Sequence, residues 1–251
     1  MVGAVTFDLW DTLVVDDSDE AVRRASGLPS KVEARSRAFV AEVRAWHDVA
    51  EERARAALDA ANEAFRHAWK VEHRTPHVAD RLRDALARLD LAPTPGFDAL
   101  VEAFASMEVV HPPRPCEGVV EALEALAGRC RLGIVSDAIV TPGSHLRRIL
   151  EGHGLLRFFH AFVFSDEAGA SKPSPRVFEL AAEGLGVSPA ALIHVGDREA
   201  NDVAGPHGVG ARAILYTGAV DRGADRTRAD AVARHLGEVP GIVDRLLSVP
   251  R

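Results

Sequence analysis

Residues 2–13 read VGAVTFDLWDTL, and the first half of this stretch has the character of a buried strand. The apolar run from Val2 to Phe7 stops at the carboxylate of Asp8. Two more runs follow the same pattern: RLGIV stops at Ser136, and ALIHV stops just before Gly196 and Asp197. Continuous apolar runs of this length are typical of strands buried on both faces, so they predict a parallel sheet covered by helices.

Helical segments alternate with these runs and with two weaker strand candidates, AFVF (161–164) and ARAIL (211–215). The segments expected to be helical are 117–127, 144–153, 175–184 and one that begins at Asn201. Strands that alternate with helices predict an α/β fold built on a parallel sheet.

Residues 16–112 differ from the rest of the chain, because they are rich in Ala, Arg and Glu and contain no strand-like run. Residues 31–70 contain no Gly or Pro and carry apolar residues at helical spacing. Thr75 and Pro76 are expected to open a further helix that runs to about Leu89, and residues 98–107 read as one more. We therefore predict an all-helical insert after the first strand, with 1–15 and 113–251 forming the core domain.

The chain has 251 residues, and its composition is ordinary for a soluble globular protein. It has 30 basic and 37 acidic residues, which give a net charge of −7. An acidic balance argues against broad nucleic-acid binding, and no apolar stretch approaches the length that spans a membrane. The two cysteines form no CxxC motif. We expect a cytoplasmic protein without a signal peptide, which acts as a monomer or homodimer.

The polar residues at the strand ends are the candidates for chemistry, because open parallel sheets bind ligands at the carboxyl ends of their strands. Asp8, Ser136 and Asp197 should meet there, with Asn201 and Asp202 close behind Asp197 in sequence. A cation is missing from this set. Lys172, in the loop sequence SKPSP, is expected to supply it.

Four segments, FDLWDTL, IVSD, SKPSP and HVGDREANDVAG, resemble in order and spacing the four motifs of the haloacid dehalogenase superfamily of hydrolases. The resemblance covers nearly the whole chain and implies a Rossmann-like core, with the helical insert as the family's helical cap. It implies that Asp8 is a nucleophile that forms a covalent aspartyl intermediate, which divides one difficult step into two.

The resemblance also implies a Mg²⁺ site and a phosphorylated small-molecule substrate. Its ligand set comprises Asp8, Asp197, Asp202 and the backbone carbonyl of Trp10. Asp202 has a second reading, in which it orients Lys172 or a metal-bound water, and a third as a simple helix-start residue.

The residues implied to contact the substrate are Ser136, Asp137, Lys172 and Asn201. Ser136 would hydrogen-bond the transferring group, and Lys172 would offset the negative charge. His194, within a strand, is expected to lie in the core or behind the site. Polar and aromatic residues of the insert could face the substrate, but we expect packing or solvent positions for them: Trp46, His47, Trp69, His73, Arg74 and His77.

One position departs from the family's phosphatase pattern. Phosphatases of the family usually carry a second aspartate two residues after the nucleophile, and here that residue is Trp10. Indole cannot act as an acid or base at neutral pH. General acid–base catalysis typically raises the rate about 10²–10⁴-fold, so its loss should slow the hydrolysis of ordinary alkyl phosphates. Asp11 is either a displaced acid or a residue that stabilises the loop through hydrogen bonds to the backbone.

Three functions remain open. The first is a Mg²⁺-dependent phosphatase with weakened acid–base catalysis, which would favour good leaving groups. The second is a 2-haloacid dehalogenase, since halide leaves without a proton and the family's dehalogenases carry an aromatic residue at this position. Asp197 argues against it, because a bare carboxylate near Asp8 would raise the pKa of the nucleophile. The third is a vestigial member that binds a ligand or partner without turnover.

Overall fold

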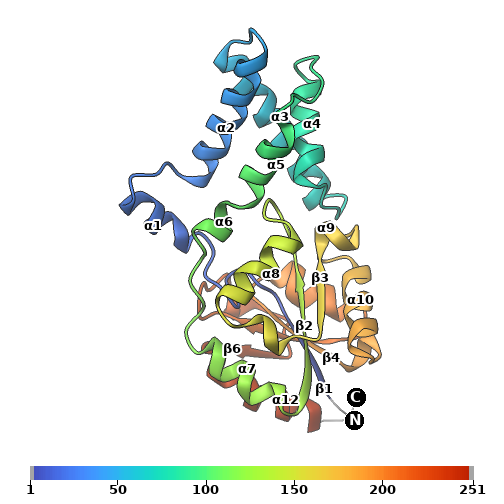
Figure 1. Ribbon diagram of the computed structural model, residues 1–251. Helices are drawn as coiled ribbons and strands as arrows, with labels where there is room; N and C mark the ends of the chain where they lie inside the picture. The colour runs from blue at the N-terminus through green and yellow to red at the C-terminus, as the bar shows by residue number, and fades with distance from the viewer. Residues whose placement is uncertain (1–2, 249–251) are drawn as a thin grey trace.

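The computed structural model describes residues 3–248 and contains a parallel six-stranded sheet (Figure 1). The strand order is β3-β2-β1-β4-β5-β6, and every neighbouring pair is parallel. The strands are β1 (Gly3–Phe7), β2 (Cys130–Ser136), β3 (Ala161–Phe164), β4 (Leu192–Gly196), β5 (Arg212–Tyr216) and β6 (Ala231–Ala233). The predicted Rossmann-like α/β fold is confirmed. Val2 and the terminal residues 249–251, which the sequence assigned to the core, lie outside the described residues.

Helices cover both faces of the sheet, which explains why its strands are apolar throughout. The longer ones are α7 (Val119–Ala127), α8 (Gly143–Gly152), α10 (Pro175–Leu185) and α12 (Val239–Ser248). Apolar residues of α7, α8 and α12 pack in one cluster with Leu132 and Ile134 of β2, while α10 packs against Val135 of the same strand. Alternate residues of β2 therefore serve opposite faces.

Short helices complete the connections of the sheet domain. They are η1 (Leu156–Phe158), α9 (Ser165–Ala168), η2 (Pro189–Ala191), η3 (Glu199–Ala204), α11 (Gly205–His207), η4 (Ala224–Arg226) and η5 (Leu236–Glu238). The segment expected to be a plain helix from Asn201 is in fact a π-helical turn, η3, followed by the three residues of α11. π-helical turns of this kind are frequent at functional sites.

Residues between β1 and α7 form six helices that stand beyond one edge of the sheet (Figure 1). They are α1 (Ser18–Ala25), α2 (Lys31–Trp46), α3 (Glu51–Lys70), α4 (Val78–Ala87), α5 (Phe97–Ala105) and α6 (Met107–Val110). Helices α2 to α5 share their own apolar cluster, which includes Phe39, Leu58, Leu82 and Phe104. We call residues 16–112, which contain these six helices, the helical insert. None of the described helices is long and apolar enough to cross a membrane.

The helix predicted after Thr75 and Pro76 is present, but its predicted start is wrong. Helix α4 begins at Val78, and His77 occupies its N-cap without a side-chain capping bond. The hydroxyl of Thr75 instead donates to Ser165 Oγ at 2.7 Å, so it joins the insert to the sheet domain. The side chain of Thr75, which the local pattern assigned to a helix cap, therefore makes a tertiary hydrogen bond instead.

Candidate active site

The carboxyl end of β1 and the loop between α9 and α10 bring the predicted nucleophile and lysine together. Lys172 Nζ lies 2.8 Å from Asp8 Oδ1 and 2.6 Å from Asp202 Oδ1. All three residues are at least 95% buried. Burial opposes the charge on the lysine, but the carboxylates of Asp202, Asp8 and Asp137 outweigh it and raise the pKa of Lys172 above its usual value. Lys172 is therefore a fixed cation beside the carboxylate of Asp8.

Asp202 acts on Lys172 from behind the site. Its Oδ1 accepts a hydrogen bond from Lys172 and lies 3.1 Å from His194 Nε2, and its Oδ2 accepts one from the backbone N–H of Arg198 at 2.9 Å. The other ring nitrogen of His194 lies 2.8 Å from Thr6 Oγ1. Burial favours the protonated acid, but Lys172 and His194 together lower the pKa of Asp202 below its usual value. His194 thus lies in the core behind the site, as the sequence indicated.

Asp197 presents one free oxygen to the site. The side chain is 1% exposed, and its Oδ1 has no hydrogen-bond partner among the described residues. Its Oδ2 is bound by Nη1 of Arg222, a residue that the sequence interpretation did not include. Burial, together with the nearby charges of Asp8 and Asp202, raises the pKa of Asp197 to about 7.

These carboxylates fit a hard divalent cation. One oxygen from each of Asp8, Asp197 and Asp202 lies within 4.8 Å of the others. Mg²⁺ prefers oxygen ligands and commonly takes one or two carboxylates, and a buried carboxylate oxygen without a partner is costly unless something binds it. Because both oxygens of Asp202 already accept hydrogen bonds, Asp8 and Asp197 are the better candidates for direct ligands.

Ser136 and Asp137 stand at the end of β2, on the other side of Asp8. The hydroxyl of Ser136 is buried and has no partner within the described chain, so it is free to contact a bound group. Asp137 is fully engaged: its Oδ1 accepts from the backbone N–H of Lys172 at 3.0 Å, and its Oδ2 accepts from Trp69 Nε1 at 2.9 Å and from Asn201 Nδ2 at 3.4 Å. Burial is the main reason that the pKa of Asp137 is raised.

Trp69 corrects the expectation that the aromatic residues of the insert pack or face solvent. It lies near the end of α3 and reaches from the insert to a carboxylate of the sheet domain. Trp46, in contrast, is 55% exposed. No local pattern distinguishes the two residues in the sequence.

Trp10 and Asp11 follow the nucleophile in a tight loop. Trp10 is partly buried beside Asp8 and donates Nε1–H to the carbonyl of Asp137 at 3.3 Å. Asp11 has a left-handed backbone, with φ of 52°. Its Oδ1 accepts from the backbone N–H of Asp16 at 3.0 Å, and its Oδ2 accepts from Arg222 Nη2 at 2.8 Å. The structure thus gives Asp11 the contacts of a loop-stabilising residue.

A pocket of about 550 Å³ lies between the edge of the sheet and the helical insert. The residues that line it from the sheet domain include Asp8, Trp10, Asp137, Lys172 and Asn201, and those from the insert include Asp16, Lys31, Arg35, Trp69 and Glu108. Asp11 does not line it. The pocket therefore opens directly onto the carboxylate of Asp8.

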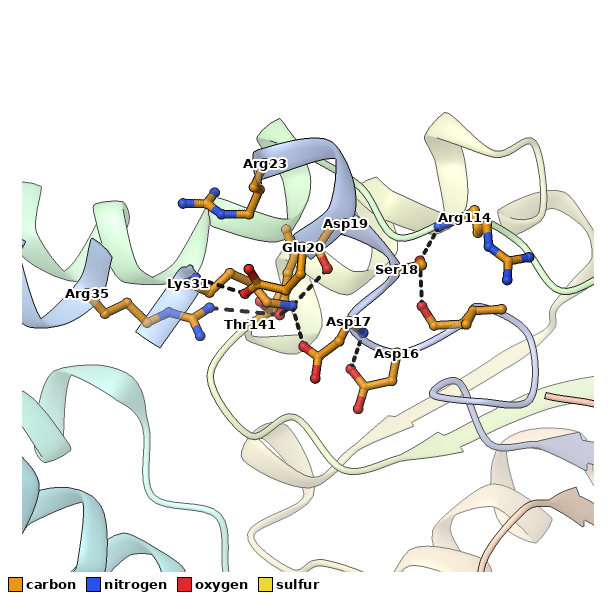
Figure 2. Close-up of polar contacts among 12 residues, drawn as sticks. Asp16, Asp17, Ser18, Asp19, Glu20, Arg23, Lys31, Arg35, Arg114 and Thr141 are labelled. Atoms are coloured by element: carbon orange, nitrogen blue, oxygen red, sulfur yellow. Dashed lines mark hydrogen bonds and ion pairs between the residues drawn. The ribbon is translucent and has the colours of Figure 1, made fainter. Parts of the chain in front are cut away.

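An ion-pair cluster centred on Lys31 (Figure 2) supplies part of the pocket lining on the side of the insert, through Asp17, Lys31 and Glu108. Lys31 Nζ lies 3.1 Å from Asp17, 2.9 Å from Asp19 and 2.9 Å from Glu108. Glu108 in turn accepts a hydrogen bond from Thr141 of the sheet domain. The cluster ties α1, α2 and α6 to one loop of the core.

Further hydrogen bonds hold the insert against the sheet domain. Arg81 donates to the carbonyl of Ile139, and the backbone N–H of Ser171, next to Lys172, donates to the carbonyl of His73 at 2.8 Å. Together with the bonds of Trp69 and Thr75, these contacts close the insert over the pocket.

Comparison with known proteins agrees with this geometry. A model of the haloacid dehalogenase-like hydrolase family matches residues 2–210. Haloacid dehalogenase-like hydrolase domain-containing protein 3 of Bos taurus is 37% identical over 101 residues, 40% of each chain. A phosphoserine phosphatase of Thermus thermophilus is 34% identical over 142 residues, 56% of this chain. The chain spans only 40% and 53% of the length of these two relatives.

Among solved structures, a 2-haloacid dehalogenase from Pseudomonas syringae pv. Tomato DC3000 matches with a TM-score of 0.65 and 26% identity, over 98% of this chain and 100% of that chain. The family model covers most of the sequence, including all four motifs whose side chains meet at Asp8. The chain belongs to the haloacid dehalogenase-like hydrolase family.

Proposed function

We propose that this protein is a Mg²⁺-dependent phosphatase that acts on a small phosphorylated metabolite through Asp8. The observation that carries the proposal is the contact of Asp8 with the fixed cation of Lys172, next to a second buried carboxylate, Asp197, whose Oδ1 has no partner among the described residues. The phosphatase name of the Thermus thermophilus relative supports it.

In the first step, a carboxylate oxygen of Asp8 forms a bond to phosphorus while the bond from phosphorus to the leaving oxygen breaks. In the second step, water attacks the same phosphorus and releases phosphate and free Asp8. Lys172 offsets the negative charge on the nucleophile and the phosphoryl group, and the hydroxyl of Ser136 donates to a phosphoryl oxygen. Bound Mg²⁺, held by Asp8 and Asp197, would neutralise further phosphate charge.

Trp10 restricts the leaving groups that this site can expel. No carboxylic acid stands at its position, and both oxygens of Asp11 are engaged by Asp16 and Arg222. With neither position 10 nor Asp11 as the donor, the departing oxygen takes its proton from water in this proposal, which favours acyl phosphates and other good leaving groups. We propose that the helical insert acts as a cap, which excludes bulk water while it is held over the pocket.

A second candidate function, 2-haloacid dehalogenase, is supported by Arg222. Its guanidinium binds Asp197, so the carboxylate beside the nucleophile is neutralised by a residue of the chain itself. This weakens the electrostatic objection to displacement of halide from carbon without a metal ion. The similarity to the Pseudomonas syringae dehalogenase points the same way.

One experiment separates the two candidates. The purified protein is incubated with acyl phosphates, phosphate esters and 2-haloacids, each with Mg²⁺ or with a chelator. Phosphate release that requires both Mg²⁺ and Asp8 supports the phosphatase, with Asp8→Asn as the variant and circular dichroism as the check on its folding. Halide release that persists in chelator would replace it with the dehalogenase. No turnover of any substrate would leave the protein as a binding member of the family.

A further inference from the structure

Arg222 lies in the loop that follows β5, at the same edge of the sheet as Asp8 and Asp197. Its side chain is 32% exposed and joins two carboxylates, because Nη1 binds Asp197 and Nη2 donates to Asp11 Oδ2 at 2.8 Å. None of the four family motifs contains this residue. It nevertheless touches the loop of the nucleophile and the candidate metal carboxylate at once.

Arg222 neutralises the one buried carboxylate of the candidate metal cluster that Lys172 does not contact. Lys172 pairs with Asp8 and Asp202, which leaves Asp197 as the third buried carboxylate of the cluster. Two arginines approach Asp197: Arg222 forms a direct hydrogen bond, whereas Arg198 Nε lies 3.9 Å away on a side chain that is 44% exposed. Arg222 is therefore the principal counter-ion of Asp197.

The two oxygens of Asp197 are also distinguished by this contact. Oδ2 is occupied by the guanidinium, and Oδ1 has no partner within the described chain. A cation that binds Oδ1 must share the carboxylate with Arg222. Two positive groups on one carboxylate repel each other, and at this range in a site open to water the repulsion amounts to about tenfold in affinity.

We propose that Arg222 is a positioning residue and built-in counter-ion that competes with a divalent cation for Asp197. It stabilises the carboxylate cluster before the cation binds, keeps Oδ1 free, and links Asp197 to the loop of the nucleophile through Asp11. Arg222 lowers the affinity of the site for the divalent cation, but it keeps the carboxylate cluster stable when no cation is bound. The competition with Mg²⁺ rests on the proposed function, whereas the stabilisation of the cluster does not.

The test compares Arg222→Gln with Arg198→Gln, which removes the more distant arginine from the same carboxylate. In chelator at pH 8, Arg222→Gln should melt about 3–6 °C below wild type, and Arg198→Gln within about 1 °C of it. In calorimetric titrations with Mg²⁺, Arg222→Gln should bind about three- to tenfold more tightly than wild type, and Arg198→Gln within about twofold. Arg222→Lys keeps the charge and should lie between Arg222→Gln and wild type in both measurements.

Two results would overturn the proposal. Mg²⁺ affinity that is unchanged or weaker in Arg222→Gln would show that Arg222 does not compete with the cation. An unchanged melting temperature in chelator would show that it is not the counter-ion of the cluster. If wild type binds no Mg²⁺, the metal-dependent function fails instead, and the melting temperatures in chelator alone decide the role of Arg222. If Arg222→Gln does not fold, Arg222→Lys carries both measurements.

Discussion

Replacement of Lys172 by methionine tests the charge balance on which the whole site depends. Methionine keeps most of the length and the apolar stem of lysine, so the change removes the ammonium with little loss of packing. Lys172 is 97% buried, and its ammonium contacts both Asp8 and Asp202. Without it, Asp8 and Asp202 lose the cation that both contact, while an oxygen of a third carboxylate, Asp197, lies within 4.8 Å of theirs.

The size of the effect follows from the burial of these groups. Removal of one partner from a buried ion pair typically costs about 3–5 kcal/mol, because the remaining charge has no compensation. For a chain of this size, this corresponds to a fall in melting temperature of about 6–20 °C. A second change, Asp202→Asn, removes one of the uncompensated charges. It should restore about 1–3 kcal/mol of the free energy of unfolding but no activity, because Asp8 still lacks its cation.

The assay is denaturant unfolding at pH 8 of wild type, Lys172→Met and Lys172→Met/Asp202→Asn, together with turnover. Lys70→Met is the matched control, because Lys70 is exposed and its loss should change the free energy of unfolding by less than about 0.5 kcal/mol. If Lys172→Met is as stable as wild type, or if Asp202→Asn destabilises it further, the charge-balance reasoning is refuted.

Three more predictions concern single residues. Trp10→Asp should raise kcat for alkyl phosphates by roughly 10²-fold while changing acyl phosphates little; an equal change for both classes would contradict the role given to position 10. Trp69→Phe removes the N–H that binds Asp137 together with one ring of the indole, so kcat/KM should fall about three- to tenfold, whereas Trp46→Phe, which makes the same change on an exposed side chain, should leave kcat/KM unchanged. Burial, Asp17 and Asp11 raise the pKa of Asp16 to about 6, so its ionised form costs stability above pH 6 and the cost fades toward pH 4. The Asp16 side chain keeps contact with solvent, which reduces the effect, so Asp16→Asn should melt only about 1–3 °C above wild type at pH 8 and equal to it at about pH 3.5; an advantage that persists undiminished at pH 3.5 would refute the assignment.

The parts of the fold that could be predicted are those in which local sequence and tertiary structure agree. Five of the six strands are apolar runs of four residues or more, and their two-sided burial leaves a continuous pattern. Strand β6 was missed because it comprises only Ala231–Ala233 at the edge of the sheet. Thr75 was misassigned because its partner, Ser165, is 90 residues away.

The same distinction holds within the site. Asp8, Ser136, Lys172 and Asp197 could be placed together because each belongs to a motif at a strand end or its loop. Arg222 and Trp69 could not, since long side chains reach the site from segments that have no motif, and Arg222 is 211 positions away from Asp11. Only the folded structure shows which arginine and which tryptophan contact the site.

The loop after the nucleophile shows why a missing catalytic group is hard to replace by a neighbour. Asp11 is one residue beyond the position where the family's phosphatases carry their acid, and its left-handed backbone turns it toward Arg222 and the N–H of Asp16. Both oxygens of Asp11 are therefore occupied by donors, and the residue does not line the pocket beside Asp8. Under the proposed function, the chemistry of Asp8 would therefore favour leaving groups that depart without a proton donor, and Trp10 lines the pocket without a group that transfers protons at neutral pH.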